Sequence, residues 1–302
     1  MVKYIAAFLL ISFCSGSFAS AKAPKIKKEI INELKLSPDT KWLNKELMQA
    51  GVSTSFRKLM IKQYDKKSFS QVMKLNVLGF LKPANHMGLV SDEAVKACRK
   101  FIEKNKNELV QVQKDYQVSP EAVSALLWIE TRHGSLKGRF HVASVYLHLM
   151  QGNREAIKNK LLVFAKKEKQ IGTPYTEKEM KTKIEERTKR KSLWAIEQIK
   201  ALEEIHSTKL KNIKNLRGSF AGAFGVPQFI PSSYKDFALP SQPESSSDLF
   251  KVSDSILSVA NYLNLHGWNQ KNPESKVKAL MDYNNSRDYA DSILEIERRL
   301  LN

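Results

Sequence analysis

Residues 119–134 read SPEAVSALLWIETRHG, and this stretch predicts a helix with both of its ends marked. Ser119 is a preferred N-cap residue. Pro120 suits the first helical position, because its missing N–H would have no partner there in any case. Gly134 is the kind of residue that ends a helix.

Glu130 lies on the apolar face of this predicted helix, in one stripe with Leu126 and Leu127. Carboxylates rarely occupy such a position without a reason. Burial would raise the pKa of the carboxyl group, as a general acid near neutral pH requires. The spacing leaves two readings open, a catalytic acid or a structural glutamate paired with Arg132 or Arg139.

Helical periodicity dominates the rest of the chain. We predict a mainly α fold with N-terminal helices and one small β element. The helical segments expected are 25–34, the region of 43–60, 91–109, 193–210, 253–265 and 287–301. Only the glycine-rich residues 218–231 look like short strands and tight turns.

The first residues predict export. A mostly apolar stretch at residues 4–13 precedes a small-x-small cleavage signal at residues 19–21. This pattern indicates a secretory signal peptide, because the apolar stretch is too short to span a bilayer. Cys14 is not expected to carry a lipid, since Phe13 before it is too large for that signal. We therefore expect residues 1–21 to be removed and the mature chain to be soluble in the periplasm.

The chain carries a formal net charge of +19. An exported protein rarely meets nucleic acid, so we expect contact with an anionic wall or membrane surface; a solvated face is the alternative. Residues 166–191 hold many basic side chains and are interpreted as an exposed insertion, part helix and part loop. We expect the protein to be a monomer.

Cysteine and histidine give no support for a disulfide or a metal site. After cleavage Cys98 has no cysteine to pair with, and we interpret it as a buried hydrophobic residue. His141 and His148 are expected to be structural, because no third ligand accompanies them. No metal and no cofactor are predicted.

Four motifs follow one another along the chain. They are ALLWIETRHG at 125–134, GSFAGAFGVPQFIPSSY at 218–234, VANYLNLHGW at 259–268, and YNNS at 283–286 with Tyr289. Together they resemble the membrane-bound lytic murein transglycosylase B family, a lysozyme-like group. The resemblance covers residues 85–302 apart from a basic insertion at about 166–191. It implies a lysozyme-like domain over 85–302 after an N-terminal helical segment at 22–84, which matches only loosely.

The resemblance implies cleavage of the β-1,4 bond between N-acetylmuramic acid (MurNAc) and N-acetylglucosamine (GlcNAc) in peptidoglycan. Glu130 would act first as the acid and then as the base, and the product would be a 1,6-anhydroMurNAc end. A lysozyme-type hydrolase is one alternative. An inactive wall-binding protein is another, although the presence of Glu130, Ser219 and Gln228 argues against it.

The resemblance also implies which residues bind the substrate. Ser219 and Gln228 would hydrogen-bond the N-acetyl group or Glu130, and Arg154 would meet the muramoyl peptide. The glycines of 218–225 would let backbone approach the sugar, or simply form a tight turn. The cleft would be lined by Tyr262, Tyr283, Asn284 and Tyr289. For Tyr289 a core role is an alternative, because it shares a helical stripe with apolar residues.

Two departures from the family pattern matter. His133 stands where an aromatic residue is commoner in the family. Residues 238–244, ALPSQPE, lack the alternating Asp and Asn ligands of the calcium loop that relatives often carry there. We therefore expect no calcium at this loop.

Overall fold

The computed structural model describes residues 39–81, 84–169, 174–208, 213–242 and 245–302. These residues form two units, each described by itself below. Unit 1 comprises 84–142 and 200–302, and unit 2 comprises the described residues up to 81 together with 143–199. The expected signal peptide and the helix expected at 25–34 lie outside the described residues. The domain boundaries expected from the sequence stay a prediction.

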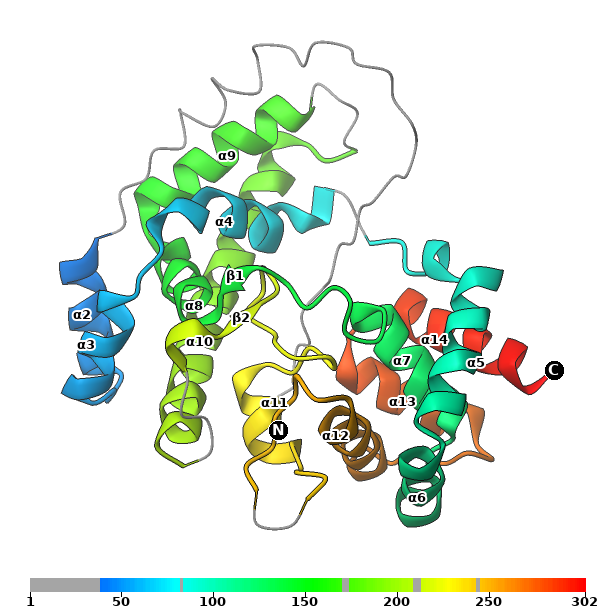
Figure 1. The fold of residues 1–302 in the computed structure, drawn as a ribbon. Coiled ribbons are helices and arrows are strands. Elements are labelled where there is room, and N and C mark those ends of the chain that lie inside the picture. The colour runs from blue at the N-terminus through cyan, green and yellow to red at the C-terminus, as the bar shows by residue number, and fades with distance from the viewer. Residues whose placement is uncertain (1–38, 82–83, 170–173, 209–212, 243–244) are drawn as a thin grey trace, which may run out of the picture. The chain divides into compact units, whose positions relative to one another are not determined.

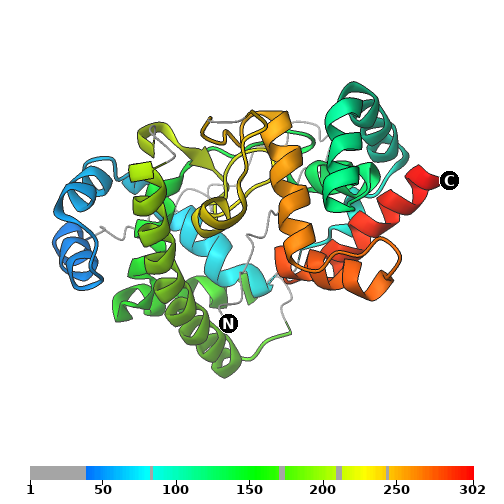
Figure 2. The same ribbon diagram turned by 90° about the horizontal axis from the view of Figure 1, so that it is seen from below.

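Helices make up most of unit 1. In chain order they are α5 (Asp92–Lys104), α6 (Lys106–Tyr116), α7 (Pro120–Thr131), α11 (Pro231–Phe237), α12 (Val252–Leu265), α13 (Pro273–Tyr283) and α14 (Arg287–Leu301). Helix α7 contacts α5, α6, α12 and α14, and it lies among them in Figure 1. Figure 2 shows the succession from α12 through α13 to α14.

The predicted start of α7 is confirmed, because the Ser119 hydroxyl accepts the N–H of Ala122 at 3.2 Å. The predicted apolar face with Leu126, Leu127 and Glu130 is buried as expected, and the helix is in addition buried on almost every other side. Even Ser124 is fully buried, and it donates its hydroxyl to the Cys98 carbonyl at 3.3 Å. The four helices around α7 leave it little exposure to solvent.

Two other helix predictions need correction. The helix expected over 91–109 is broken at Asn105, whose side-chain amide donates to the Phe101 carbonyl at 2.7 Å. Such a side-chain bond competes with continuation of the helix. Helix α13 was not predicted, although Asn272 caps it and Pro273 occupies its first turn. The closing helices α12 and α14 match their predictions within one residue.

The β element is as small as predicted. Strand β1 (Phe140–His141) pairs antiparallel with β2 (Arg217–Gly218), and Phe140 lies opposite Gly218. Bridges from Gly218 to Phe224 and from Phe224 to Phe229 fold the glycine-rich stretch back on itself. The mainly α class with one small β element is therefore confirmed.

Unit 2 is also helical. Its elements are α2 (Thr40–Gln49), α3 (Thr54–Lys62), η1 (Lys66–Ser68), α4 (Phe69–Val77), η2 (Leu78–Leu81), α8 (Val142–Met150), η4 (Gln151–Asn153), α9 (Glu155–Lys169) and most of α10 (Glu177–Thr208). His148 is buried between the Tyr64 and Ser68 hydroxyls at 2.7 and 2.9 Å, and burial lowers its pKa to about 3. In unit 1, His141 bonds the Lys214 carbonyl at 2.8 Å. Both histidines thus have the structural contacts expected of them.

The basic segment 166–191 is exposed only in part. Its described residues belong mostly to α9 and α10. Met180, Ile184 and Thr188 follow one another at intervals of four along α10, and all three are buried. Within the described ranges, no helix combines the length and the apolar character needed to cross a bilayer.

The segment between α11 and α12 is organised by the buried carboxylate of Asp254. One of its oxygens accepts the N–H and the hydroxyl of Ser241 at 3.0 and 2.5 Å, and the other accepts the N–H of Asp248 at 2.7 Å. The neighbouring Leu249 carbonyl accepts the N–H of Val226 at 2.7 Å, which ties the segment to the glycine-rich stretch. A carboxylate of the chain itself therefore holds this loop.

Replacing Asp254 with asparagine should destabilise unit 1 by about 2–4 kcal/mol, because an amide group would face donors that a buried carboxylate now satisfies. Urea denaturation measures this loss. Ser253→Ala is the matched control, since the Ser253 hydroxyl touches Asp254 only at 3.5 Å. Calcium or a chelator should leave the unfolding temperature of the unmodified protein unchanged. A calcium-dependent rise would contradict this account of the loop.

Candidate active site

Glu130 lies in the last turn of α7, with 3 % of its surface exposed. Tyr289, in the first turn of α14, donates its hydroxyl to Glu130 Oε1 at 2.6 Å. Burial raises the pKa of Glu130 from 4.5 to about 8, and the hydrogen bond from Tyr289 opposes part of that rise. Near neutral pH the group is therefore a protonated acid.

The alternative of a structural ion pair does not match this geometry. The Arg132 guanidinium lies over the Trp128 ring, 5.7 Å from its centroid, and that of Arg139 lies over Phe140 at the same distance. In the part of the chain that the structure describes, neither arginine bonds Glu130 or perturbs its pKa.

The chain turns sharply after Glu130. Arg132, His133 and Gly134 have φ angles of 49°, 53° and 90°, so α7 ends at Thr131 and not at Gly134 as predicted. The Thr131 hydroxyl donates to the Val226 carbonyl at 2.7 Å and accepts the N–H of Gly134 at 2.9 Å. These bonds tie the end of α7 to the glycine-rich stretch.

The imidazole ring of His133 packs as an uncharged aromatic ring would. It stacks on Phe101 with 4.0 Å between the ring centroids. Its Nε2 lies 3.0 Å from the Ser124 carbonyl. Burial lowers its pKa to about 4, so the ring is uncharged near neutral pH.

Three tyrosines from α12, α13 and α14 gather beside Glu130. The ring centroids of Tyr262 and Tyr283 are 4.8 Å apart, and those of Tyr283 and Tyr289 are 6.3 Å apart. Tyr262 donates to the Asp282 carbonyl at 2.8 Å, and Tyr283 donates to the carbonyl of Pro227. Burial, followed by the nearby charge of Glu130, raises the pKa of Tyr283 and of Tyr289 well above the usual value. Both remain hydrogen-bond donors.

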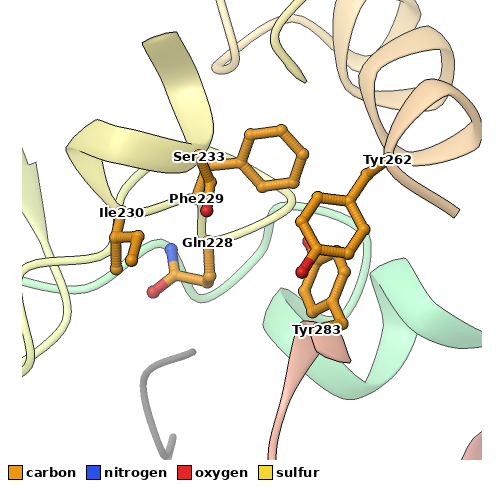
Figure 3. Close-up of a pocket in the computed structure, with 6 residues that line it drawn as sticks. All are labelled: Gln228, Phe229, Ile230, Ser233, Tyr262 and Tyr283. Atoms are coloured by element: carbon orange, nitrogen blue, oxygen red, sulfur yellow. The ribbon is translucent and has the colours of Figure 1, made fainter. Parts of the chain in front are cut away.

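A small pocket that is partly open to solvent adjoins these tyrosines (Figure 3). It is lined by Gln228, Phe229, Ile230, Ser233, Tyr262 and Tyr283. In Figure 3, Tyr262 and Tyr283 lie together on one side, and Gln228 and Ile230 lie on the other. A sugar fits such a mixture of aromatic faces and polar groups.

Among the described residues of unit 1, two buried amide oxygens have no hydrogen-bond partner: Gln228 Oε1, which belongs to the pocket, and Asn284 Oδ1, in the residue that follows Tyr283. Gln228 is held by its own amide nitrogen, which donates to the Gly225 carbonyl at 2.7 Å and to the Lys137 carbonyl at 3.3 Å. Buried acceptors are normally satisfied. The amide oxygen of Gln228, which lines the pocket, can therefore accept a hydrogen bond from a ligand's amide or hydroxyl group.

Ser219 and Arg154 already have protein partners. The Ser219 hydroxyl oxygen accepts the N–H groups of Ala221 and Ala223 at 3.3 and 3.2 Å, which closes the turn after β2. Arg154 belongs to unit 2, where it pairs with Asp39 at 3.6 Å and lies over the Trp42 ring. The structure thus brings together Glu130, Gln228 and the predicted tyrosines, while Arg154 is described only within its own unit.

The sequence interpretation overlooked His86. Its ring packs edge-on against Tyr289 with 5.4 Å between the centroids, and it bonds Asp288 at 3.1 Å. The available signal was that its partner Asp288 directly precedes Tyr289 in the sequence.

Comparison with protein families finds a match between residues 41–278 and the family described as Transglycosylase SLT domain. Among characterised proteins, the chain is 52% identical over 54 residues to membrane-bound lytic murein transglycosylase B of Escherichia coli (strain K12). That alignment covers 18% of this chain and spans only 15% of the length of that relative.

Solved structures share the fold. The Escherichia coli lytic transglycosylase Slt35 in complex with bulgecin A matches with a TM-score of 0.64 and 16% identity, over 86% of this chain and 91% of that one. SltB3 from Pseudomonas aeruginosa in complex with NAG-anhNAM-pentapeptide matches with a TM-score of 0.62 and 15% identity, over 87% and 78%. The likeness agrees with the lysozyme-like, mainly helical architecture expected from the sequence.

Proposed function

Since the chain belongs to the Transglycosylase SLT domain family, we propose that it cuts peptidoglycan glycan strands between MurNAc and GlcNAc without consuming water. The observation that carries the proposal is the buried carboxyl group of Glu130, with a pKa of about 8 and a hydrogen bond from Tyr289. The product would end in 1,6-anhydroMurNAc.

Glu130 can serve both proton transfers because its pKa is raised. At neutral pH it is protonated, and it gives its proton to the glycosidic oxygen as the bond to C1 breaks. The acetamido oxygen of MurNAc supports the positive charge at C1. The C6 hydroxyl then attacks C1 and returns a proton to Glu130, which burial has made a strong base. The hydroxyl of Tyr289 stabilises the carboxylate between the two steps.

A single acid suffices for this sequence of steps, unlike the two carboxylates of most glycosidases. Within the described ranges, no second carboxylate contributes to the raised pKa of Glu130. Asp282 and Asp288 are instead engaged with Lys278 and His86. This arrangement supports the lone-acid mechanism over a hydrolase that needs a second acid.

Substrate contacts are assigned first to the two amide oxygens of unit 1 that have no partner among the described residues. Gln228 Oε1 and Asn284 Oδ1 accept hydrogen bonds from the acetamido N–H or from sugar hydroxyls. Ser219 accepts two backbone N–H groups, so its own O–H can donate to the acetamido oxygen. Tyr262 and Tyr283 offer aromatic faces to the sugar rings. Arg154 is assigned to the acidic muramoyl peptide.

The proposed substrate lies outside the inner membrane. This agrees with the signal peptide expected at residues 1–21, and we propose that the mature protein works as a monomer in the periplasm. Its formal net charge of +19 favours contact with the anionic wall.

Mass spectrometry of digested peptidoglycan tests the proposed reaction. The purified mature chain should release muropeptides that end in 1,6-anhydroMurNAc, each lighter by one water than the hydrolytic product. Reducing ends alone would identify a hydrolase of the same bond. Binding to the wall without any release would identify a wall-binding protein. Glu130→Gln serves as the inactive control.

The cleavage rate should fall as the pH rises through about 8, because Glu130 must carry a proton to act as the acid. The ratio kcat/KM for a soluble glycan fragment, measured from pH 5 to about 10, reports this basic limb. The unfolding temperature over the same range controls for loss of structure. A rate that already falls steadily from pH 5 upward, as a glutamate with the ordinary pKa of 4.5 would produce, would contradict the raised pKa of Glu130.

A further inference from the structure

Asp288 clamps the segment before α5 onto the start of α14. Its Oδ2 accepts the backbone N–H of His86 at 2.5 Å and lies 3.1 Å from His86 Nδ1. Its Oδ1 accepts the N–H of Met87 at 3.4 Å. The clamp is therefore a carboxylate that binds two successive backbone groups and one ring.

The clamped ring of His86 packs directly on Tyr289. His86 is 3 % exposed, and its ring meets that of Tyr289 edge-on, at 89° between the planes. Tyr283 stacks on the same ring at 12° between the planes. The backbone of Tyr289 is held as well, because its N–H donates to the Ser286 hydroxyl at 3.3 Å. These contacts leave the phenol little freedom to turn away from Glu130.

We propose that Asp288 and His86 are positioning residues, which act through Tyr289 to keep its hydroxyl on Glu130. The contacts form an unbroken chain from Asp288 to His86, from His86 to Tyr289, and from Tyr289 to Glu130 at 2.6 Å. Neither positioning residue lines the pocket. The inference rests on the proposed function only in giving Glu130 a catalytic role.

The charged and titratable groups around Tyr289 determine how the pKa of Glu130 would change if the contacts of Asp288 were weakened. Glu130 faces it from α7, Tyr283 from α13 and Tyr262 from α12, and His86 packs on its ring. Burial lowers the pKa of His86 although Asp288 opposes this, so the ring is a neutral donor to Asp288 at neutral pH. The hydrogen bond from Tyr289 lowers the pKa of Glu130. Losing that bond would therefore move the pKa of Glu130 further upward.

Asp288→Asn is the direct test, because the amide keeps the size of the side chain but turns an N–H group toward the donors of the 86–87 segment. We expect kcat to fall about tenfold with little change in KM, since the pocket is untouched. The basic limb of the pH profile should move to higher pH by up to about one unit, the equivalent of one hydrogen bond. Tyr289→Phe removes the hydroxyl altogether, so it gives the largest upward shift of the basic limb that loss of this bond can produce.

Asp291→Asn is the matched control on the same helix, because Asp291 bonds only the exposed Arg287 within the described structure. It should leave both kcat and the basic limb unchanged. His86→Phe is a second variant that keeps a ring on Tyr289 but removes the Nδ1 bond to Asp288. It should shift the limb in the same direction by a smaller amount.

A fall in activity with an unmoved basic limb in Asp288→Asn and His86→Phe would overturn the proposal, because a merely structural defect lowers the rate at every pH. Unchanged activity and an unchanged limb would overturn it too. Each variant is also compared with the double variant that carries Glu130→Gln in addition. The pH dependence of the difference between their free energies of unfolding reports the pKa of Glu130 without any catalytic turnover. Failure of the proposed function, in which the unmodified protein cleaves no glycan, would therefore leave this second measurement intact.

Discussion

Glu130→Gln should lower the rate of glycan cleavage about a thousandfold while the protein stays folded. General acid–base catalysis by one side chain contributes roughly 10²–10⁴-fold, and the same residue is proposed for both proton transfers. Glutamine keeps the size of the side chain, and its carbonyl can still accept the Tyr289 hydroxyl, which now bonds Glu130 at 2.6 Å. Release of soluble muropeptides measures the rate, and circular dichroism checks the fold.

The same substitution should stabilise the protein in a pH-dependent manner. The pKa of Glu130 is about 8 in the folded protein against an ordinary 4.5, so between these values the folded state binds more protons than the unfolded state. The unmodified protein therefore loses stability as the pH rises from about 4.5 to about 8, and the glutamine variant does not. Its advantage should reach a few kcal/mol, since one pKa unit corresponds to about 1.4 kcal/mol.

Glu121→Gln is the control, because Glu121 is partly exposed and lies in the first turn of α7, at the opposite end of the helix from Glu130. It should cleave glycan at close to the normal rate. Normal activity in Glu130→Gln would refute the catalytic assignment. A stability difference that stays constant with pH would refute the argument from burial.

Gly138→Ala should unfold unit 1 far more readily than the same change at Gly267. Both glycines have left-handed backbone, with φ of +87° and +81°. A Cβ atom on Gly138 would lie 2.2 Å from the backbone carbonyl of Gly218 and 2.6 Å from the nitrogen of Ser219, whereas one on Gly267 would meet nothing within 4 Å. Backbone cannot move aside as a flexible side chain can.

We expect Gly267→Ala to cost about 1 kcal/mol, the penalty for an L-residue in this conformation. Gly138→Ala should cost about 3 kcal/mol or more, because β1 must separate from β2 as well. Urea denaturation followed by circular dichroism compares the two variants. Equal losses would show that the backbone angle alone, and not the close approach of the two strands, makes glycine necessary at 138.

These close approaches also revise the interpretation of the glycine-rich stretch. A Cβ on Gly218 would lie 2.0 Å from the Ala223 carbonyl, and one on Gly225 would lie 2.5 Å from the Leu249 side chain. The space at these two glycines is thus filled by the protein itself. The tight-turn interpretation explains them without any contact between their backbone and a sugar.

Local features of the fold were predictable from short stretches. Ser119 and Pro120 mark the start of α7 because a cap acts on N–H groups two or three residues away. The closing helices α12 and α14 follow from periodicity for a similar reason. The break at Asn105 was missed because an asparagine is compatible with either outcome until its side chain bonds the backbone.

The sequence by itself determined that the chain is mainly helical, where α5, α7, α12 and α14 begin, and that Glu130 is an acid at an apolar position. Only the tertiary structure decided that α7 is buried on nearly all sides and that the partner of Glu130 is Tyr289. The arginines considered as partners are close in sequence, whereas Tyr289 is 159 residues away. Caps and periodicity depend on neighbours along the chain, so they can be read directly. The pKa of Glu130 depends on how α5, α6, α12 and α14 pack around α7, and no local pattern contains that information.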